Sequence, residues 1–239
     1  MPAKKQARAA VAAAAGFEGF PRGGERWFAE LASEQSRDWY VANKADYERL
    51  WLRPMQALLA DVHRRLTPAY RGVGLAEPKI FRIHRDVRFA KDKTPYKTNI
   101  AGMIATGRDG RATERAAALY VSFGLDEGAA AGVWMPSPEA LARWRKALLD
   151  DKRGAELERL VAAVRKRRLE VRAHEVLSRA PRGFPPDHPR VELARHKGLV
   201  VNLPAVPRGL IHEPGLAAWL AERATEVAPL VSWLARNVT

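Results

Sequence analysis

The chain has 239 residues, no cysteine and a formal net charge of +14. Without cysteine there can be no disulfide framework, no thiolate metal site and no cysteine nucleophile, which favours a reducing, cytoplasmic compartment. The hydrophobic share of 47% argues against a disordered chain. No apolar run approaches the roughly 20 residues that a membrane-spanning helix needs, so no membrane partner is expected.

The first third of the chain predicts helices. Residues 1–15 form a basic, Ala-rich segment that we expect to be a disordered tail, and residues 16–239 are expected to form one domain. Apolar residues recur at helical spacing in GERWFAELASEQ. Ser36 can cap the next helix, and Pro54 must kink that helix or begin another one.

From Lys79 onward the pattern changes to short apolar or alternating runs broken by Gly, Asp and Pro, which is typical of strands. The predicted strands are KIFRIH, NIAGMIAT, AALYVSFG, AAAGVWMP and, later, GLVVNLPA. Further helices are predicted after Ser137 as a cap, along the apolar stripe from Leu157 to Val164, and at the C-terminus. The predicted fold class is α+β: a mainly antiparallel sheet of about four to six strands with helices packed against it, the N-terminal helices first.

The most distinctive segment is the basic block, residues 79–98, which contains FRIHRDVRFAKDKTPYKT. It carries seven cations and two carboxylates, and we expect it to bind a phosphate-bearing ligand, such as a nucleotide or nucleic acid, because Arg forks and Lys ammonium groups suit phosphate oxygens. The predicted ligand-binding residues are Arg82, Arg85, Arg88, Lys91, Lys93, Tyr96, Lys97 and Trp134. Tyr96 or Trp134 would stack on the ligand.

Two alternatives stay open for the same block. If the strand persists, Arg82, His84 and Asp86 share one face, and Asp86 could orient His84 as a general base or could ligate a metal in an enzyme acting on a phosphorylated substrate. The block could instead be an internal brace in which arginines pair with neighbouring carboxylates. The sequence identifies no cofactor and does not predict a metal site from the other histidines, whose spacing does not match a zinc site.

The segment RDVRFAKDKTPYKT resembles the signature of the domain of unknown function family 2461, a family of conserved hypothetical proteins. SRDWYVANKADYE is similar to the early helix of that family, LYVSF and GVWMP to its central hairpin, DHP to a late loop, and PLVSWL to its C-terminus. The family has no established activity, so the resemblance implies the position of the signature and no catalytic role for any residue.

Overall fold

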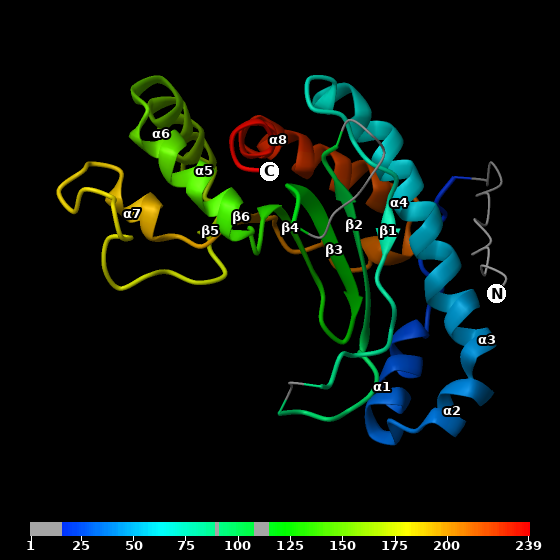
Figure 1. Cartoon of the computed structure of the whole chain (residues 1–239). Helices are drawn as coiled ribbons and strands as arrows, with labels where there is room; N and C mark the ends of the chain where they lie inside the picture. The colour runs from blue at the N-terminus through cyan, green and yellow to red at the C-terminus, as the bar shows by residue number, and fades with distance from the viewer. Residues whose placement is uncertain (1–15, 89–90, 108–114) are drawn as a thin grey trace, which may run out of the picture.

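Six antiparallel strands form one sheet in the computed structural model, which describes residues 16–88, 91–107 and 115–239 (Figure 1). The strand order is β1-β2-β3-β4-β6-β5. The strands are β1 Lys79–Ile80, β2 Asn99–Ala105, β3 Ala118–Gly124, β4 Gly128–Val133, β5 Val171–Arg172 and β6 Leu199–Asn202. The α+β class, the antiparallel sheet and the leading helices are as predicted.

Helices precede, interrupt and follow the sheet. They are α1 Gly24–Glu34, α2 Arg37–Ala42, α3 Lys44–Tyr47, α4 Arg53–Leu66, α5 Pro138–Leu149, α6 Asp151–Lys166, α7 Val191–Arg195 and α8 Gly215–Asn237. Both predicted caps are present, because Ser36 and Ser137 each accept a hydrogen bond from the backbone N–H three residues on, at 3.2 Å. A π-helical turn, Glu48–Leu52, joins α3 to α4, and Pro54 lies in the first turn of α4, where the missing N–H costs little.

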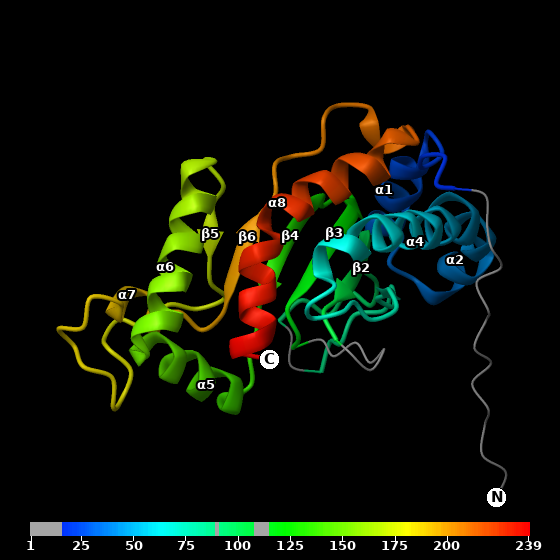
Figure 2. The same ribbon diagram turned by 90° about the horizontal axis from the view of Figure 1, so that it is seen from above.

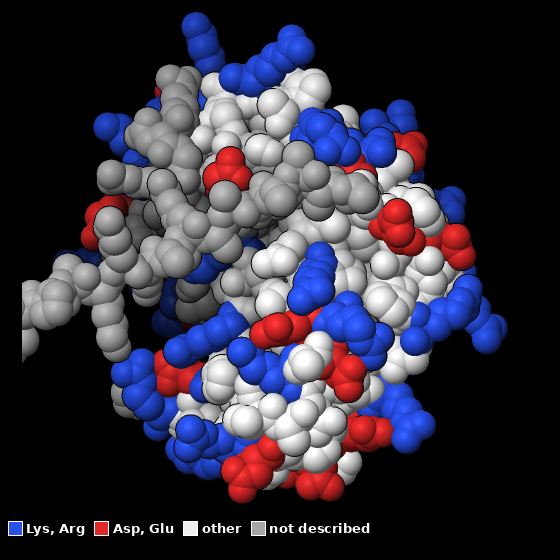
Figure 3. Space-filling view, turned by 90° about the vertical axis from the view of Figure 1, so that its right-hand side faces the viewer, with Lys and Arg blue, Asp and Glu red and all other residues white. Residues whose placement is uncertain are grey.

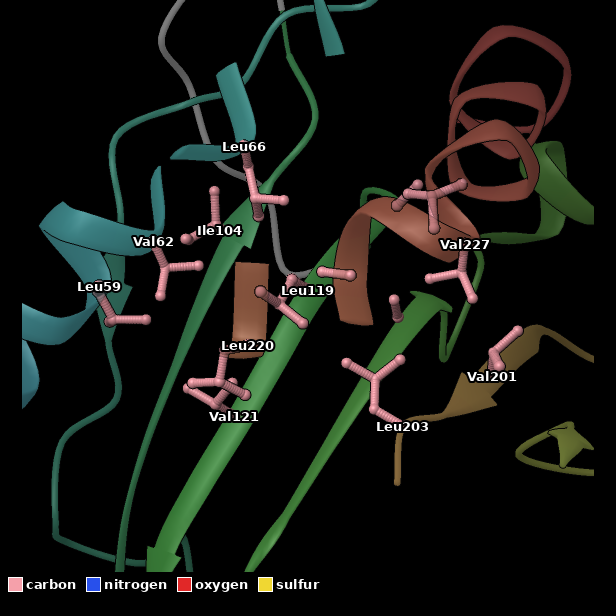
Figure 4. Close-up of a cluster of buried hydrophobic side chains, with 14 of the residues drawn as sticks. Leu59, Val62, Leu66, Ile104, Leu119, Val121, Val201, Leu203, Leu220 and Val227 are labelled. Atoms are coloured by element: carbon pink, nitrogen blue, oxygen red, sulfur yellow. The ribbon is translucent and has the colours of Figure 1, made fainter. Parts of the chain in front are cut away.

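The core lies between one face of the sheet and helices α4 and α8. Figure 2 shows both helices on the same side of the sheet. Figure 4 shows the meeting point, where Leu59, Val62 and Leu66 of α4 and Leu220 and Val227 of α8 face Ile104, Leu119 and Val121 of the sheet. Each such side chain contributes about 1.5–3 kcal/mol when fully buried.

Gly102 allows α4 to lie close to β2. A Cβ atom on Gly102 would lie 2.6 Å from the Cδ1 atom of Leu59 and 3.0 Å from the carbonyl oxygen of Lys79. Position 102 therefore has no room for a side chain. Glycine at this position lets α4 pack directly on β2, next to the first residue of the basic block.

Two strand predictions differ from the structure. The run KIFRIH was expected to be one strand, but β1 ends at Ile80 and Ile83 lies in a bend. β5 was not predicted, because two residues that pair only with β6 leave no periodic pattern. The predicted tail, residues 1–15, lies outside the described residues.

Candidate functional site

The basic block forms a short antiparallel arm at the end of the sheet. The N–H of Arg85 donates to the carbonyl of Pro95, and the N–H of Lys97 donates to the carbonyl of Ile83, both at 2.8 Å. His84 therefore lies opposite Tyr96 in an isolated bridge. These bonds bring the two halves of the block together before the chain enters β2.

Tyr96 anchors the arm to the helical region. Its side chain is 4% exposed, and its ring stacks on that of Tyr40 with centroids 4.7 Å apart. The side chain of Gln35 accepts a hydrogen bond from the N–H of Tyr96 at 3.0 Å and donates to its carbonyl at 3.4 Å. The ring predicted to stack on a ligand thus already packs inside the protein.

Several charged side chains of the block form ion pairs or hydrogen bonds within the arm. Arg85 pairs with Asp92 and donates to the Thr94 hydroxyl at 2.6 Å. Lys93 donates to the carbonyl of Val87 at 2.9 Å. These contacts hold the loop in shape, as expected for a brace.

Asp86 is held by a two-pronged contact with Arg88. The guanidinium donates from Nε at 2.9 Å and from Nη2 at 2.7 Å. Hydrogen bonds from Arg88, together with the charges of Arg88 and Arg82, lower the pKa of Asp86 from 3.8 to about 2. A carboxylate with so low a pKa is a weak proton acceptor, so this geometry favours a structural role for Asp86 over that of a general base.

His84 packs against aromatic rings and forms no hydrogen bond to Asp86 among the described residues. Its ring centroid is 5.1 Å from that of Tyr96 and 5.6 Å from that of Tyr40. The structure therefore does not assemble the predicted His84–Asp86 pair. Across residues 16–88, 91–107 and 115–239, no group of three or more His, Asp or Glu side chains could hold a metal ion.

A hollow of about 650 Å³ lies between the arm and the sheet, and we call it the Phe81–Tyr120 hollow. The rings of Phe81 and Tyr120 lie 6.2 Å apart. Lys79 and Lys97 place their ammonium groups 5.5 and 5.6 Å from the centre of the Phe81 ring. Polar wall residues of the hollow include Arg85, Asp92, Thr94, Thr98, Asn99 and Asp126. The hollow thus joins aromatic rings, cations and hydrogen-bonding groups.

A second hollow of about 600 Å³ lies on the other side of the segment 80–84, and we call it the α4–β1 groove. Its walls are mainly apolar and aromatic, and they include Tyr40, Tyr47, Leu59 and Ile80. Arg82 and His84 line this groove and are absent from the lining of the Phe81–Tyr120 hollow. The predicted ligand-binding residues are thus divided between two sites.

Trp134 lies apart from the basic block. Gly132 pairs with Ala118 at the start of β3, whereas the block leads into Asn99, which pairs with Gly124 at the end of β3. Trp134 therefore lies at the opposite end of the sheet, where its ring contacts that of His174 at 5.2 Å. The structure does not bring Trp134 together with the arginines and lysines of the block.

Lys91 and Arg88 are exposed and line neither of the two hollows. On the face of the molecule that carries α3 and α4, Lys and Arg side chains are interspersed with Asp and Glu (Figure 3). Such alternation is typical of a solvated surface with local ion pairs, and it differs from the continuous basic stripe of many nucleic-acid-binding proteins.

Several site residues were missed in the sequence. Tyr120, Gln35, Tyr40 and Asn99 were not among the predicted ligand-binding residues. Periodicity alone could place Tyr120 on a sheet face, but only the pairing of β1 with β2 and β3 brings it near Phe81. Gln35 is 61 residues away from its partner Tyr96, so no local pattern indicates their contact.

The fold and the two hollows define an α+β protein with a basic arm at the first edge of an antiparallel sheet. The chain belongs to the family described as "Conserved hypothetical protein (DUF2461)", whose model matches residues 25–233. No curated protein and no solved structure matched the chain. None of the helices in the described part of the chain combines the length and the apolar character that crossing a bilayer requires.

Proposed function

We propose that the protein binds a small phosphate-bearing ligand, such as a nucleotide, in the Phe81–Tyr120 hollow. The observation that carries the proposal is the placement of the Lys79 and Lys97 ammonium groups, 5.5 and 5.6 Å from the centre of the Phe81 ring. Phe81 and Lys97 line the hollow of about 650 Å³, and Lys79 reaches it across the Phe81 ring. Two ammonium groups suit phosphate oxygens, and aromatic rings suit a nucleobase.

The wall of the hollow also contains carboxylates, which restrict where a phosphate can lie. Asp92 is paired with Arg85 and accepts a hydrogen bond from the N–H of Thr94 at 2.9 Å, so its charge is compensated within the wall. Asp126 contributes the other carboxylate. The phosphate is therefore expected on the side of Lys79 and Lys97, with the base toward Tyr120.

On the face shown in Figure 3, cations and carboxylates alternate, which supports a small ligand over a long nucleic acid lying along that face. The nucleic-acid version predicts that the logarithm of the affinity for a single-stranded oligonucleotide falls steeply with the logarithm of the salt concentration. A cytoplasmic location, which the cysteine-free sequence favours, would expose the protein to nucleotides.

Calorimetric titration of the full chain with ATP, AMP and adenosine tests the proposal. ATP should bind more tightly than AMP, adenosine should bind weakly or not at all, and Lys97→Met should weaken ATP binding about tenfold, because a charge-assisted contact is worth about 1.5–3 kcal/mol. Lys91→Met is the matched control, since it removes the same charge from the same block outside the hollow. Equal losses in the two variants, or no nucleotide binding by the wild-type chain, would contradict the proposal.

An enzyme that uses His84 and Asp86 on a phosphorylated substrate stays an untested prediction. If nucleotide hydrolysis is detected, Asp86→Asn distinguishes the two functions. Loss of turnover with intact ATP binding would support the enzyme, and unchanged turnover would remove Asp86 from the mechanism.

A further inference from the structure

The segment from Ile80 to His84 forms an open edge of the sheet. β1 is the terminal strand, and its pairing partner is β2. The N–H of Phe81 donates to the carbonyl of Ala101 at 2.9 Å. Because backbone groups alternate in direction along an extended chain, the N–H and C=O groups of Ile80 and Arg82 point away from β2.

Beyond the bend at Ile83, His84 in the arm again has outward backbone groups. The carbonyl of Ile83 accepts from Lys97, and the N–H of Arg85 donates to Pro95, so the N–H and C=O groups of His84 between them point outward. Within residues 16–88, 91–107 and 115–239, no backbone group bonds to the outward groups of Ile80, Arg82 or His84. Ile80 and Arg82, before the bend at Ile83, and His84, after it, thus offer backbone donors and acceptors to an incoming strand that follows the bend.

The α4–β1 groove runs beside this edge and can receive side chains. Its volume is about 600 Å³, and Leu52, Gln56 and Ala60 of the helical region line the side opposite Ile80. His63 also lines the groove, and its Nε2 atom is buried without a hydrogen-bond partner in the described part of the chain. An apolar groove with a few polar groups is the usual form of a site that takes a side chain or a small ligand.

The positive charge of Arg82 indicates what kind of strand the edge binds. It is exposed at the centre of the edge, and none of the described carboxylates forms an ion pair with it. The nearby carboxylate of Asp86 is already held by Arg88. Glu77 also lines the groove, so an acidic side chain of the occupant is expected at Arg82 and not beside Glu77. In a symmetric pairing of two copies about this position, Arg82 would face the same residue of the second copy, and like charges directly opposite each other destabilise a sheet.

We propose that the edge Ile80–His84 and the α4–β1 groove bind an extended acidic peptide segment of a partner protein by adding it to the sheet as a further strand. The peptide pairs its backbone with Ile80, Arg82 and His84, places an Asp or Glu opposite Arg82 and inserts a neighbouring apolar side chain into the groove. Main-chain bonds supply affinity in this mode of recognition, and the pocket supplies specificity. This site shares Phe81 with the Phe81–Tyr120 hollow, and the other lining residues of the two hollows differ.

The test begins with a displayed library of random nine-residue peptides selected on the full wild-type chain. The strongest selected peptide is then synthesised and titrated by fluorescence anisotropy. Selected sequences should share an acidic residue next to an apolar one. On binding, amide exchange measured by NMR should slow about tenfold or more at Ile80, Arg82 and His84, since these amides gain hydrogen bonds, and much less at Phe81, which is already bonded.

Variants separate edge pairing from other forms of binding. Ala60→Trp fills the groove from an exposed position on α4 and should abolish peptide binding, whereas Arg53→Trp, also exposed on α4 but outside the groove lining, should leave it unchanged. Arg82→Glu should weaken the acidic peptide at least about tenfold, since it replaces an attractive charge pair by a repulsive one. Lys97→Met should leave peptide binding unchanged, because Lys97 does not line the groove. The peptide proposal and the nucleotide proposal can therefore fail independently.

Three outcomes overturn the inference. The first is a library selection that yields no peptide whose binding depends on Ala60 and Arg82. The second is a selected peptide that keeps full affinity in both of two N-methylated versions, one with the backbone amides on one side of its strand methylated and one with those on the other side methylated. Edge pairing uses the amides on one side, so one of the two versions must lose affinity if the inference holds. The third is a concentration-dependent dimer, detected by sedimentation, that Ala60→Trp disrupts, which would assign the edge to a second copy of the chain.

Discussion

The two hollows on either side of the segment 80–84 differ in how their walls are built. The α4–β1 groove includes core residues, such as Tyr40, which is 8% exposed and contacts several other rings. The Phe81–Tyr120 hollow uses surface residues on the opposite side, such as Tyr120, which is 40% exposed. The two walls therefore differ in burial: Tyr40 is held by the core, whereas Tyr120 is partly exposed to solvent.

The largest expected effect is a difference in the free energy of unfolding between a variant of the α4–β1 groove and a variant of the Phe81–Tyr120 hollow. Tyr40→Ala should lower the free energy of unfolding by about 3 kcal/mol, because it leaves a cavity among packed aromatic rings. Tyr120→Ala should cost less than about 1 kcal/mol, because the ring is already partly in water. Urea denaturation of both variants gives the comparison, and equal costs would show that the two walls are not different in kind.

A smaller effect concerns the attachment of the arm that both hollows share. Gln35→Ala should cost about 1–2 kcal/mol, because it removes both side-chain hydrogen bonds to the Tyr96 backbone. Gln56→Ala, at an exposed position on α4 whose side chain has no hydrogen-bond partner within the described part of the chain, is the control and should be nearly neutral. If Gln35→Ala also leaves the urea midpoint unchanged, the arm is held by the Tyr40–Tyr96 stack alone.

The smallest effect is the titration of Asp86. Its pKa is lowered to about 2 in the folded protein from an ordinary value of 3.8, so its contribution to stability is fully present above pH 3.8 and is lost as the pH falls through about 2. Arg88→Ala should return the pKa toward 3.8. Carboxyl carbon NMR shifts followed from pH 5 to pH 1.5 measure this change, and a pKa that stays near 2 in the variant would assign the shift to other groups.

The elements that follow from local patterns were predictable. Ser36 and Ser137 cap helices because their hydroxyls reach the N–H three residues on, a relation contained within one turn. β2, β3 and β4 follow from short apolar runs separated by turn residues. The basic block was located by its composition, and the family model places it within residues 25–233.

The predicted list of site residues mixed positions that the fold separates. Tyr96 looked available for stacking because an aromatic residue beside cations often contacts a ligand, but its ring is buried against Tyr40, 56 positions earlier in the chain. Trp134 was grouped with the block because its aromatic ring could stack on a ligand, but the register of β2, β3 and β4 places it at the other end of the sheet. Residue type alone does not contain either fact.

By itself, the sequence determined the class of the fold, the order of its elements and the position of the basic block, because periodicity, capping and charge are short-range properties. Only the tertiary structure decided that the block folds back on itself, that Arg85 and Arg88 are paired within it, and that Arg82 and Lys97 face different hollows. The reason is that these outcomes depend on the pairing of β1 with β2, on the contact of Gln35 with Tyr96 and on the close approach of α4 at Gly102, all of which join residues distant in the chain.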